Sequence, residues 1–82
     1  MKKLIIRKPK FMRSEELMQR NIEAAQAIQK EIKEHESTLM DSQYADLWDS
    51  WWYYIGEAAK KGGFFNVDDF REWANREGIK LM

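Results

Sequence analysis

Apolar positions between residues 14 and 36 recur every three or four residues, which is the spacing of one face of an α-helix. Ser14 precedes two glutamates, and a hydroxyl cap followed by acids favours a helix start at this point. Asn21 and Gln29 interrupt the apolar stripe. We interpret them as residues at its solvated edge, with a register-fixing contact to a partner helix as the alternative. The stripe consists of Leu17, Met18, Ile22, Ala25, Ile28 and Ile32.

The segment 42–61 predicts a second helix with an unusually wide apolar arc. It holds three of the four tryptophans and all three tyrosines of the chain. Trp52 and Tyr54 flank the predicted core face on either side, and Tyr53 points to the polar side. Gly56 interrupts the helix at a cost of about 1 kcal/mol relative to alanine, and we expect it to allow a close backbone approach. The core face consists of Tyr44, Leu47, Trp48, Trp51, Ile55, Ala58 and Ala59.

The ends of this second helix are marked by short polar and glycine motifs. Thr38 and Asp41 have the spacing of a capping box, with Asp41 or Ser42 as alternative starts. The glycine pair at 62–63 predicts the helix end, since a left-handed turn costs glycine little.

A third, short helix is expected after Asn66, which caps a first turn containing two aspartates, and Gly78 closes it. We expect Trp48, Trp51 and Trp73 to form an aromatic core shared by the three helices. The apolar face of the third helix consists of Val67, Phe70, Trp73 and Ala74.

Charge is distributed unevenly along the chain although its net value is zero. Residues 1–13 carry six basic side chains and no acid, whereas the other 69 residues carry eight basic and fourteen acidic ones. A β-prone run at 4–6 needs a partner strand, and pairing with residues 79–82 or with another subunit are the alternatives. Residues 1–13 therefore form a basic arm attached to an acidic body.

These patterns predict a mainly α fold with one helical domain, residues 14–82, preceded by the basic extended arm, residues 1–13. Within the domain, a helical hairpin packs residues 14–36 against 42–61, and the short third helix closes one end. The arm is extended and forms a β-pairing in one alternative. The central helix offers more apolar surface than one small body covers, so a homo-oligomer, most simply a dimer, is expected.

Catalytic and metal-binding signatures are missing from the sequence. The 82 residues include one histidine and no cysteine, and no serine or glycine-rich motif has the setting of a nucleophile or phosphate site. Glu31 and His35 are four residues apart, but a metal site needs further ligands nearby. We therefore expect a non-enzymatic protein without a cofactor or metal. No apolar run is long enough to cross a membrane, and we expect a cytoplasmic location.

The function that these residues favour is protein binding. Trp52, Tyr53 and Tyr54, with Asp49 beside them, lie at or beyond the edge of the predicted core. Exposed tryptophan and tyrosine are typical of interaction hot spots. We therefore predict that these four residues contact a partner protein.

Binding of a nucleic acid or nucleotide is the alternative. Arg7, Lys8, Lys10 and Arg13 would supply positive charge, and the edge aromatics would stack on bases. A cation from the arm beside Trp52 or Tyr53 would complete such a pocket. The acidic body, which repels a polyanion, argues against this alternative.

The C-terminal stretch FFNVDDFREWANREGI resembles small accessory proteins encoded by bacteriophages and mobile elements. The resemblance covers about a fifth of the chain and assigns no functional residue. It implies an inhibitor or regulator that binds a host protein.

Overall fold

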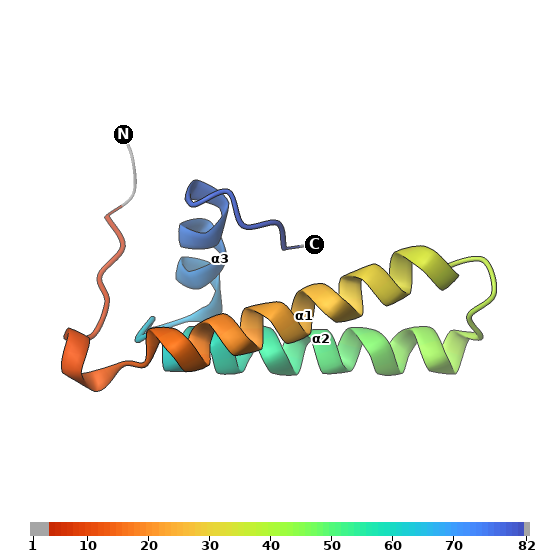
Figure 1. Ribbon diagram of the computed structural model, residues 1–82, viewed down its shortest axis with the longest axis horizontal. Coiled ribbons are helices and arrows are strands. Elements are labelled where there is room, and N and C mark those ends of the chain that lie inside the picture. The colour runs from red at the N-terminus through yellow and green to blue at the C-terminus, as the bar shows by residue number, and fades with distance from the viewer. Residues whose placement is uncertain (1–3, 82) are drawn as a thin grey trace.

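The computed structural model describes residues 4–81 and confirms a mainly helical fold (Figure 1). Within this range the helices are α1 (Glu15–His35), α2 (Asp41–Lys61) and α3 (Val67–Arg76), with a short 3-10 helix, η1, at Lys10–Met12. The described residues contain no strand, only one isolated bridge.

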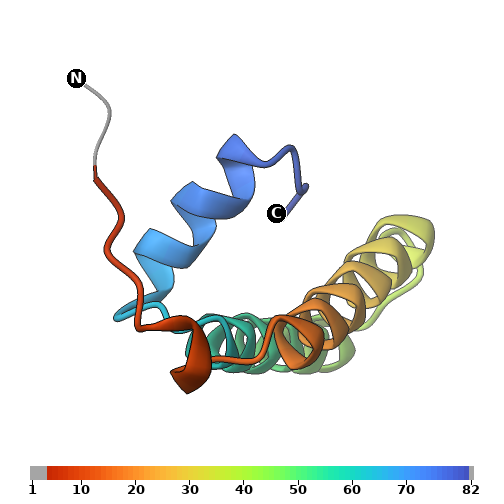
Figure 2. The same ribbon diagram turned by 60° about the vertical axis from the view of Figure 1, so that its left-hand side comes forward.

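The long helices α1 and α2 run antiparallel and pack along their length, whereas α3 crosses the hairpin near one end (Figure 1). The segment after α3 turns back towards α1, as the rotated view in Figure 2 also shows. The molecule is therefore elongated, with principal extents of 43 × 28 × 17 Å. Much of the surface of α2 is exposed and is not covered by α1 or α3.

Two helix starts follow the predicted capping residues. The Ser14 hydroxyl accepts a hydrogen bond from the Leu17 amide at 3.2 Å at the start of α1. The Asn66 side-chain oxygen accepts one from the Asp69 amide at 2.8 Å at the start of α3. Each bond satisfies an amide that has no partner within its helix.

The start of α2 differs from the predicted capping box. The Thr38 hydroxyl donates to the His35 carbonyl at 3.0 Å, so it terminates α1 and does not cap α2. The residue before α2 is Met40, whose amide donates to the side-chain oxygen of Gln43 at 3.1 Å. Thr38 does not cap α2 because it lies two residues before the N-cap position, which Met40 occupies.

The core lies where the three helices meet, and Trp51 is at its centre with no exposed surface. Trp48 and Trp73 are only partly buried. Trp48 contacts Trp51 edge-to-face at 5.3 Å between ring centroids, whereas Trp73 stacks with Phe70 at 6.1 Å. The other buried members of this core are Met18, Ile22, Ala25, Ile55, Ala58, Ala59, Phe64 and Phe70.

Gln29 connects three parts of the fold through its side-chain amide. Its oxygen accepts a hydrogen bond of 2.7 Å from the indole nitrogen of Trp51, and its nitrogen donates to the Lys80 carbonyl at 3.2 Å. Gln29 thus fixes α1 against α2 of the same chain and also holds the C-terminal segment. Asn21 bonds only within its own helix, to the Leu17 carbonyl at 2.8 Å.

Glycines with positive φ end two of the helices as predicted. Gly63 has φ 78° after α2, and Gly78 has φ 77° after α3. After Gly78 the chain folds back, and the Ile79 amide donates to the Ala74 carbonyl at 2.9 Å. Ile79 then packs against the core.

The described part of the arm contacts the turn between α2 and α3. Arg7 forms the isolated antiparallel bridge with Phe64, and the Lys8 amide donates to the Gly63 carbonyl at 2.9 Å. The arm therefore pairs with the turn at residues 62–64. The predicted pairing of the arm with residues 79–82 is not seen for residues 79–81, which lie beside α3 and α1. Residue 82 lies outside the described range.

We predict that replacing Gln29 by leucine destabilises the protein by about 1–3 kcal/mol, because the buried indole N–H of Trp51 loses its acceptor. Urea unfolding followed by circular dichroism measures the change. Gln26→Leu is the matched control, since Gln26 bonds the same Lys80 carbonyl at 3.4 Å but does not contact the indole nitrogen. Equal losses in the two variants would contradict the role assigned to Gln29.

Candidate protein-interaction surface

Two large aromatic side chains are exposed next to each other on α2. Trp52 is 49% exposed and Tyr53 is 63% exposed, although Trp51 immediately before them is fully buried. Successive residues of an α-helix point about 100° apart, so a helix that buries Trp51 must turn Trp52 to its flank and Tyr53 outward. The predicted division of the aromatic stretch into a core and an edge is therefore present.

The other two predicted partner-binding residues lie on either side of this pair. Asp49 is exposed and lies one helical turn before Trp52 and Tyr53. Tyr54 is partly buried and packs against the core, with its ring centroid 5.3 Å from that of Tyr53. Tyr54 thus belongs to the opposite flank of α2 from Trp52 and supports the Tyr53 ring.

Gly56 lies one turn after Trp52 and Tyr53 on the same outward side of α2. A Cβ atom built at Gly56 meets no other heavy atom within 4 Å. The close backbone approach that we expected is not made by any described part of this chain. The helix backbone at Gly56 is therefore uncovered one turn after two exposed rings. We call the set Asp49, Trp52, Tyr53 and Gly56 the outer face of α2.

The outer face of α2 carries negative charge at its N-terminal end. Asp46 and Asp49 are both exposed, and they lie two turns and one turn before Tyr53, respectively. Glu57, one turn after Tyr53, pairs with Lys60 at 3.7 Å. The two aspartates thus give the outer face an acidic end, while the following turn is locally neutralised.

The cation beside Trp52 comes from α3 and not from the arm. The Arg71 guanidinium carbon lies 5.4 Å from the ring centroid of Trp52 and 5.9 Å from that of Trp51. Sequence reasoning missed Arg71 because no local motif marks it, and only the packing of α3 against α2 brings it there. Residues from two helices thus share the Trp52 edge.

The four basic residues of the alternative site are not gathered into one free surface. Arg7 donates to the Gly62 carbonyl through two nitrogens, at 2.9 and 2.6 Å, and pairs with Glu15 at 2.9 Å. Arg13 faces the same Glu15 carboxylate at 3.3 Å. Both guanidiniums are therefore engaged within the fold, whereas Lys8 and Lys10 are exposed.

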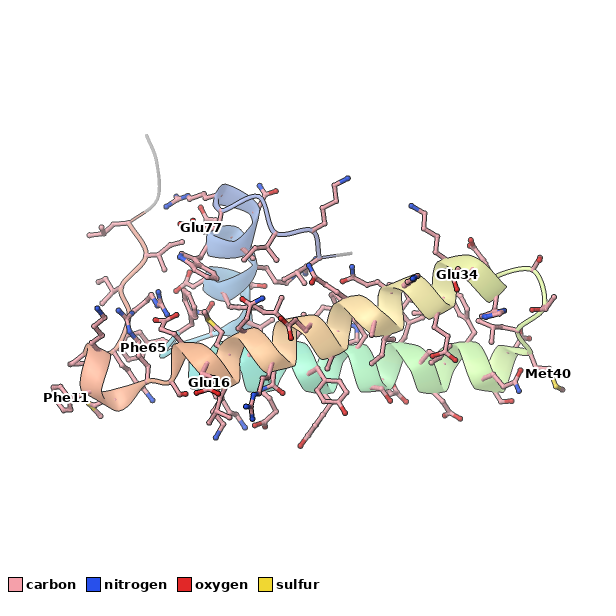
Figure 3. All side chains as sticks on the ribbon, viewed as in Figure 1. Phe11, Glu16, Glu34, Met40, Phe65 and Glu77 are labelled. Carbon is pink, nitrogen blue, oxygen red and sulfur yellow. The ribbon has the colours of Figure 1, made fainter. Side chains whose placement is uncertain are left out.

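Arg7 also lies over aromatic rings at the junction of the helices. Its guanidinium carbon is 4.3 Å from the Phe64 ring centroid and 5.2 Å from that of Trp73. A planar guanidinium stacked on rings and bonded to a backbone carbonyl holds the arm in place. Exposed apolar side chains surround this end of the molecule, including Phe11 and Phe65 (Figure 3).

The described part of the molecule also contains two open cavities. One, of about 290 Å³, lies between α1 and α2 and is lined in part by Leu39, Gln43 and Leu47. The other, of about 700 Å³, lies between α3 and the C-terminal segment. Within residues 4–81, no group of three acidic or histidine side chains could hold a metal ion, and no helix is long and apolar enough to span a membrane.

Comparison of the chain with protein-family models, with curated proteins and with solved structures finds no match.

We predict that Arg7→Lys lowers the free energy of unfolding by about 1–2 kcal/mol, because lysine cannot reproduce the guanidinium contacts to Gly62 and Glu15. Lys10→Ala, an exposed change in the same arm, should alter it by less than about 0.5 kcal/mol. Chemical denaturation of both variants measures the difference. Equal effects would mean that Arg7 is not part of the folded structure and is available to bind phosphate.

Proposed function

We propose that this chain is a non-enzymatic protein that binds a partner protein through the outer face of α2, and acts as an inhibitor or regulator by occupying the partner's surface. The observation that carries the proposal is a pair of exposed aromatic rings, Trp52 and Tyr53, one turn before an uncovered stretch of helix backbone at Gly56. Tryptophan and tyrosine contribute much of the binding energy of protein interfaces when they become buried there. Trp52 and Tyr53 are placed for this role.

Gly56 supports the proposal through its effect on stability. Glycine in the interior of a helix costs about 1 kcal/mol relative to alanine, and a Cβ would meet no obstacle at this position. The fold of the single chain therefore gains nothing from glycine here. A partner group seated between Trp52 and Tyr53 would gain direct access to the helix backbone.

The charges of the face favour a partner segment that carries lysine or arginine. Asp46 and Asp49 would attract such a segment, and the exposed Tyr53 ring would accept a cation on its face. A rigid helix also presents the rings without a large ordering cost on binding. A regulator directed at a host protein, as the resemblance of the C-terminal stretch implies, fits this mode of action.

We predict that Gly56→Ala stabilises the free protein by about 0.5–1 kcal/mol while weakening capture of its partner. The reason is that the new methyl group adds helix propensity but covers the backbone that a partner group would contact beside the rings. Thermal unfolding measures the first effect. Quantified pull-down with the tagged protein, followed by titration of the identified partner, measures the second.

Tyr53→Ala should weaken the same capture without a matching loss of stability, because the Tyr53 ring is mostly exposed. Lys33→Ala on α1 is the control and should change neither measurement, since Lys33 is exposed and remote from α2's outer face. Undiminished partner binding by both Gly56→Ala and Tyr53→Ala would overturn the proposal.

The homodimer expected from the wide apolar arc and the nucleic-acid alternative remain predictions. Light scattering after size exclusion tests the first, and a dimer that Gly56→Ala dissociates would identify a second copy as the partner. The nucleic-acid alternative predicts binding that falls steeply with salt. It draws less support from the fold, because Arg7 and Arg13 already contact Glu15.

A further inference from the structure

The larger cavity lies between α3 and the C-terminal segment and has a mixed lining. Its volume is about 700 Å³, within the range of small-molecule sites. Arg71 and Asn75 of α3 line one side, and Ile79, Lys80 and Leu81 line the other. Figure 2 shows the C-terminal segment curving back beside α3. A cationic group, an amide and two aliphatic side chains thus border one space.

The wall formed by the C-terminal segment is held in place by the rest of the fold. The Lys80 carbonyl accepts hydrogen bonds from the side chains of Gln26 and Gln29, at 3.4 and 3.2 Å. Ile79 and Leu81 pack against the core, and the Ile79 amide bonds to α3. The cavity is therefore formed by the folded chain before any ligand arrives.

The charges around the cavity favour an anion. Arg71 makes no ion pair within the described residues and is held instead against the faces of Trp51 and Trp52. Glu72 is the acidic residue of the lining, and Arg76 neutralises it at 3.2 Å. Arg71 and Lys80 consequently dominate the charge of the lining.

We infer that this cavity binds a small amphipathic anion: a carboxylate or phosphate with an apolar or aromatic body. The anionic group accepts hydrogen bonds from the Arg71 guanidinium, whose fork of N–H groups matches carboxylate and phosphate oxygens. The Asn75 amide adds a further donor, and the apolar body lies against Ile79 and Leu81. Tyr53 and Gly56 do not line this cavity, although Arg71 also contacts Trp52, so the site adjoins the protein-binding surface proposed above.

Titration with phenyl phosphate and phenylacetate, monitored by amide chemical shifts, tests the inference. Both anions should bind saturably at millimolar concentration and shift amides within residues 71–81, and neutral benzyl alcohol should bind roughly tenfold more weakly because it lacks the charge-assisted bonds. Arg71→Met should weaken both anions by a similar factor. Arg20→Met, which removes the same charge from an exposed pair with Glu16 on α1, should leave the affinities unchanged.

Three results would overturn the inference: absence of saturable binding by both anions, shifts that centre on Lys8 and Lys10, or equal affinities in the Arg71 and Arg20 variants. The shift map of the unmodified protein decides the matter even where Arg71→Met fails to fold. Tyr53→Ala separates this site from the protein-binding surface, since it should not alter binding of either anion.

Discussion

The hydrogen bond from the Trp51 indole to Gln29 is the interaction on which the arrangement of this protein most depends. A fully buried indole N–H without an acceptor would cost about 1–3 kcal/mol, a large fraction of the stability of so small a domain. Gln29 supplies that acceptor only in one register of α1 against α2. Its amide nitrogen simultaneously holds the Lys80 carbonyl, so the same side chain also positions the wall of the larger cavity.

The rotation of α2 about its axis follows from this constraint. With Trp51 and Ile55 directed into the core, Trp52 lies at the edge next to α3, and Tyr53 faces outward. Gly56 then lies one turn after the two exposed rings, and no residue of the range 4–81 packs against it. The exposure of Trp52 and Tyr53 thus follows from the burial of Trp51 and its hydrogen bond to Gln29. The cavity beside Arg71 adjoins the Trp52 edge of the outer face of α2, because Arg71 lines the cavity and contacts the Trp52 ring.

Features encoded by neighbouring residues could be predicted from the sequence, and features created by packing could not. The capping by Ser14 and Asn66, the ends of α2 and α3, and the exposure of Trp52 follow from spacing of a few residues. Two contacts depend on tertiary packing that no local pattern specifies. Arg71 reaches Trp52 because α3 packs against α2. Arg7 reaches Gly62 and Glu15 because the arm folds back onto the helices. Gln29 was recognisable as a polar residue in an apolar stripe, but its partner was not.

Solvent exchange of the tryptophan indole protons tests the division between core and outer face most directly. Of the four indoles in the chain, that of Trp51 should exchange with water far more slowly than that of Trp52, because Trp51 is fully buried and bonded whereas Trp52 is 49% exposed. Single tryptophan-to-phenylalanine variants assign the resonances. Slow exchange at Trp51 with fast exchange at Trp52 is the predicted result. Comparable exchange rates at the two indoles would contradict both the anchoring role of Gln29 and the outward placement of the aromatic pair.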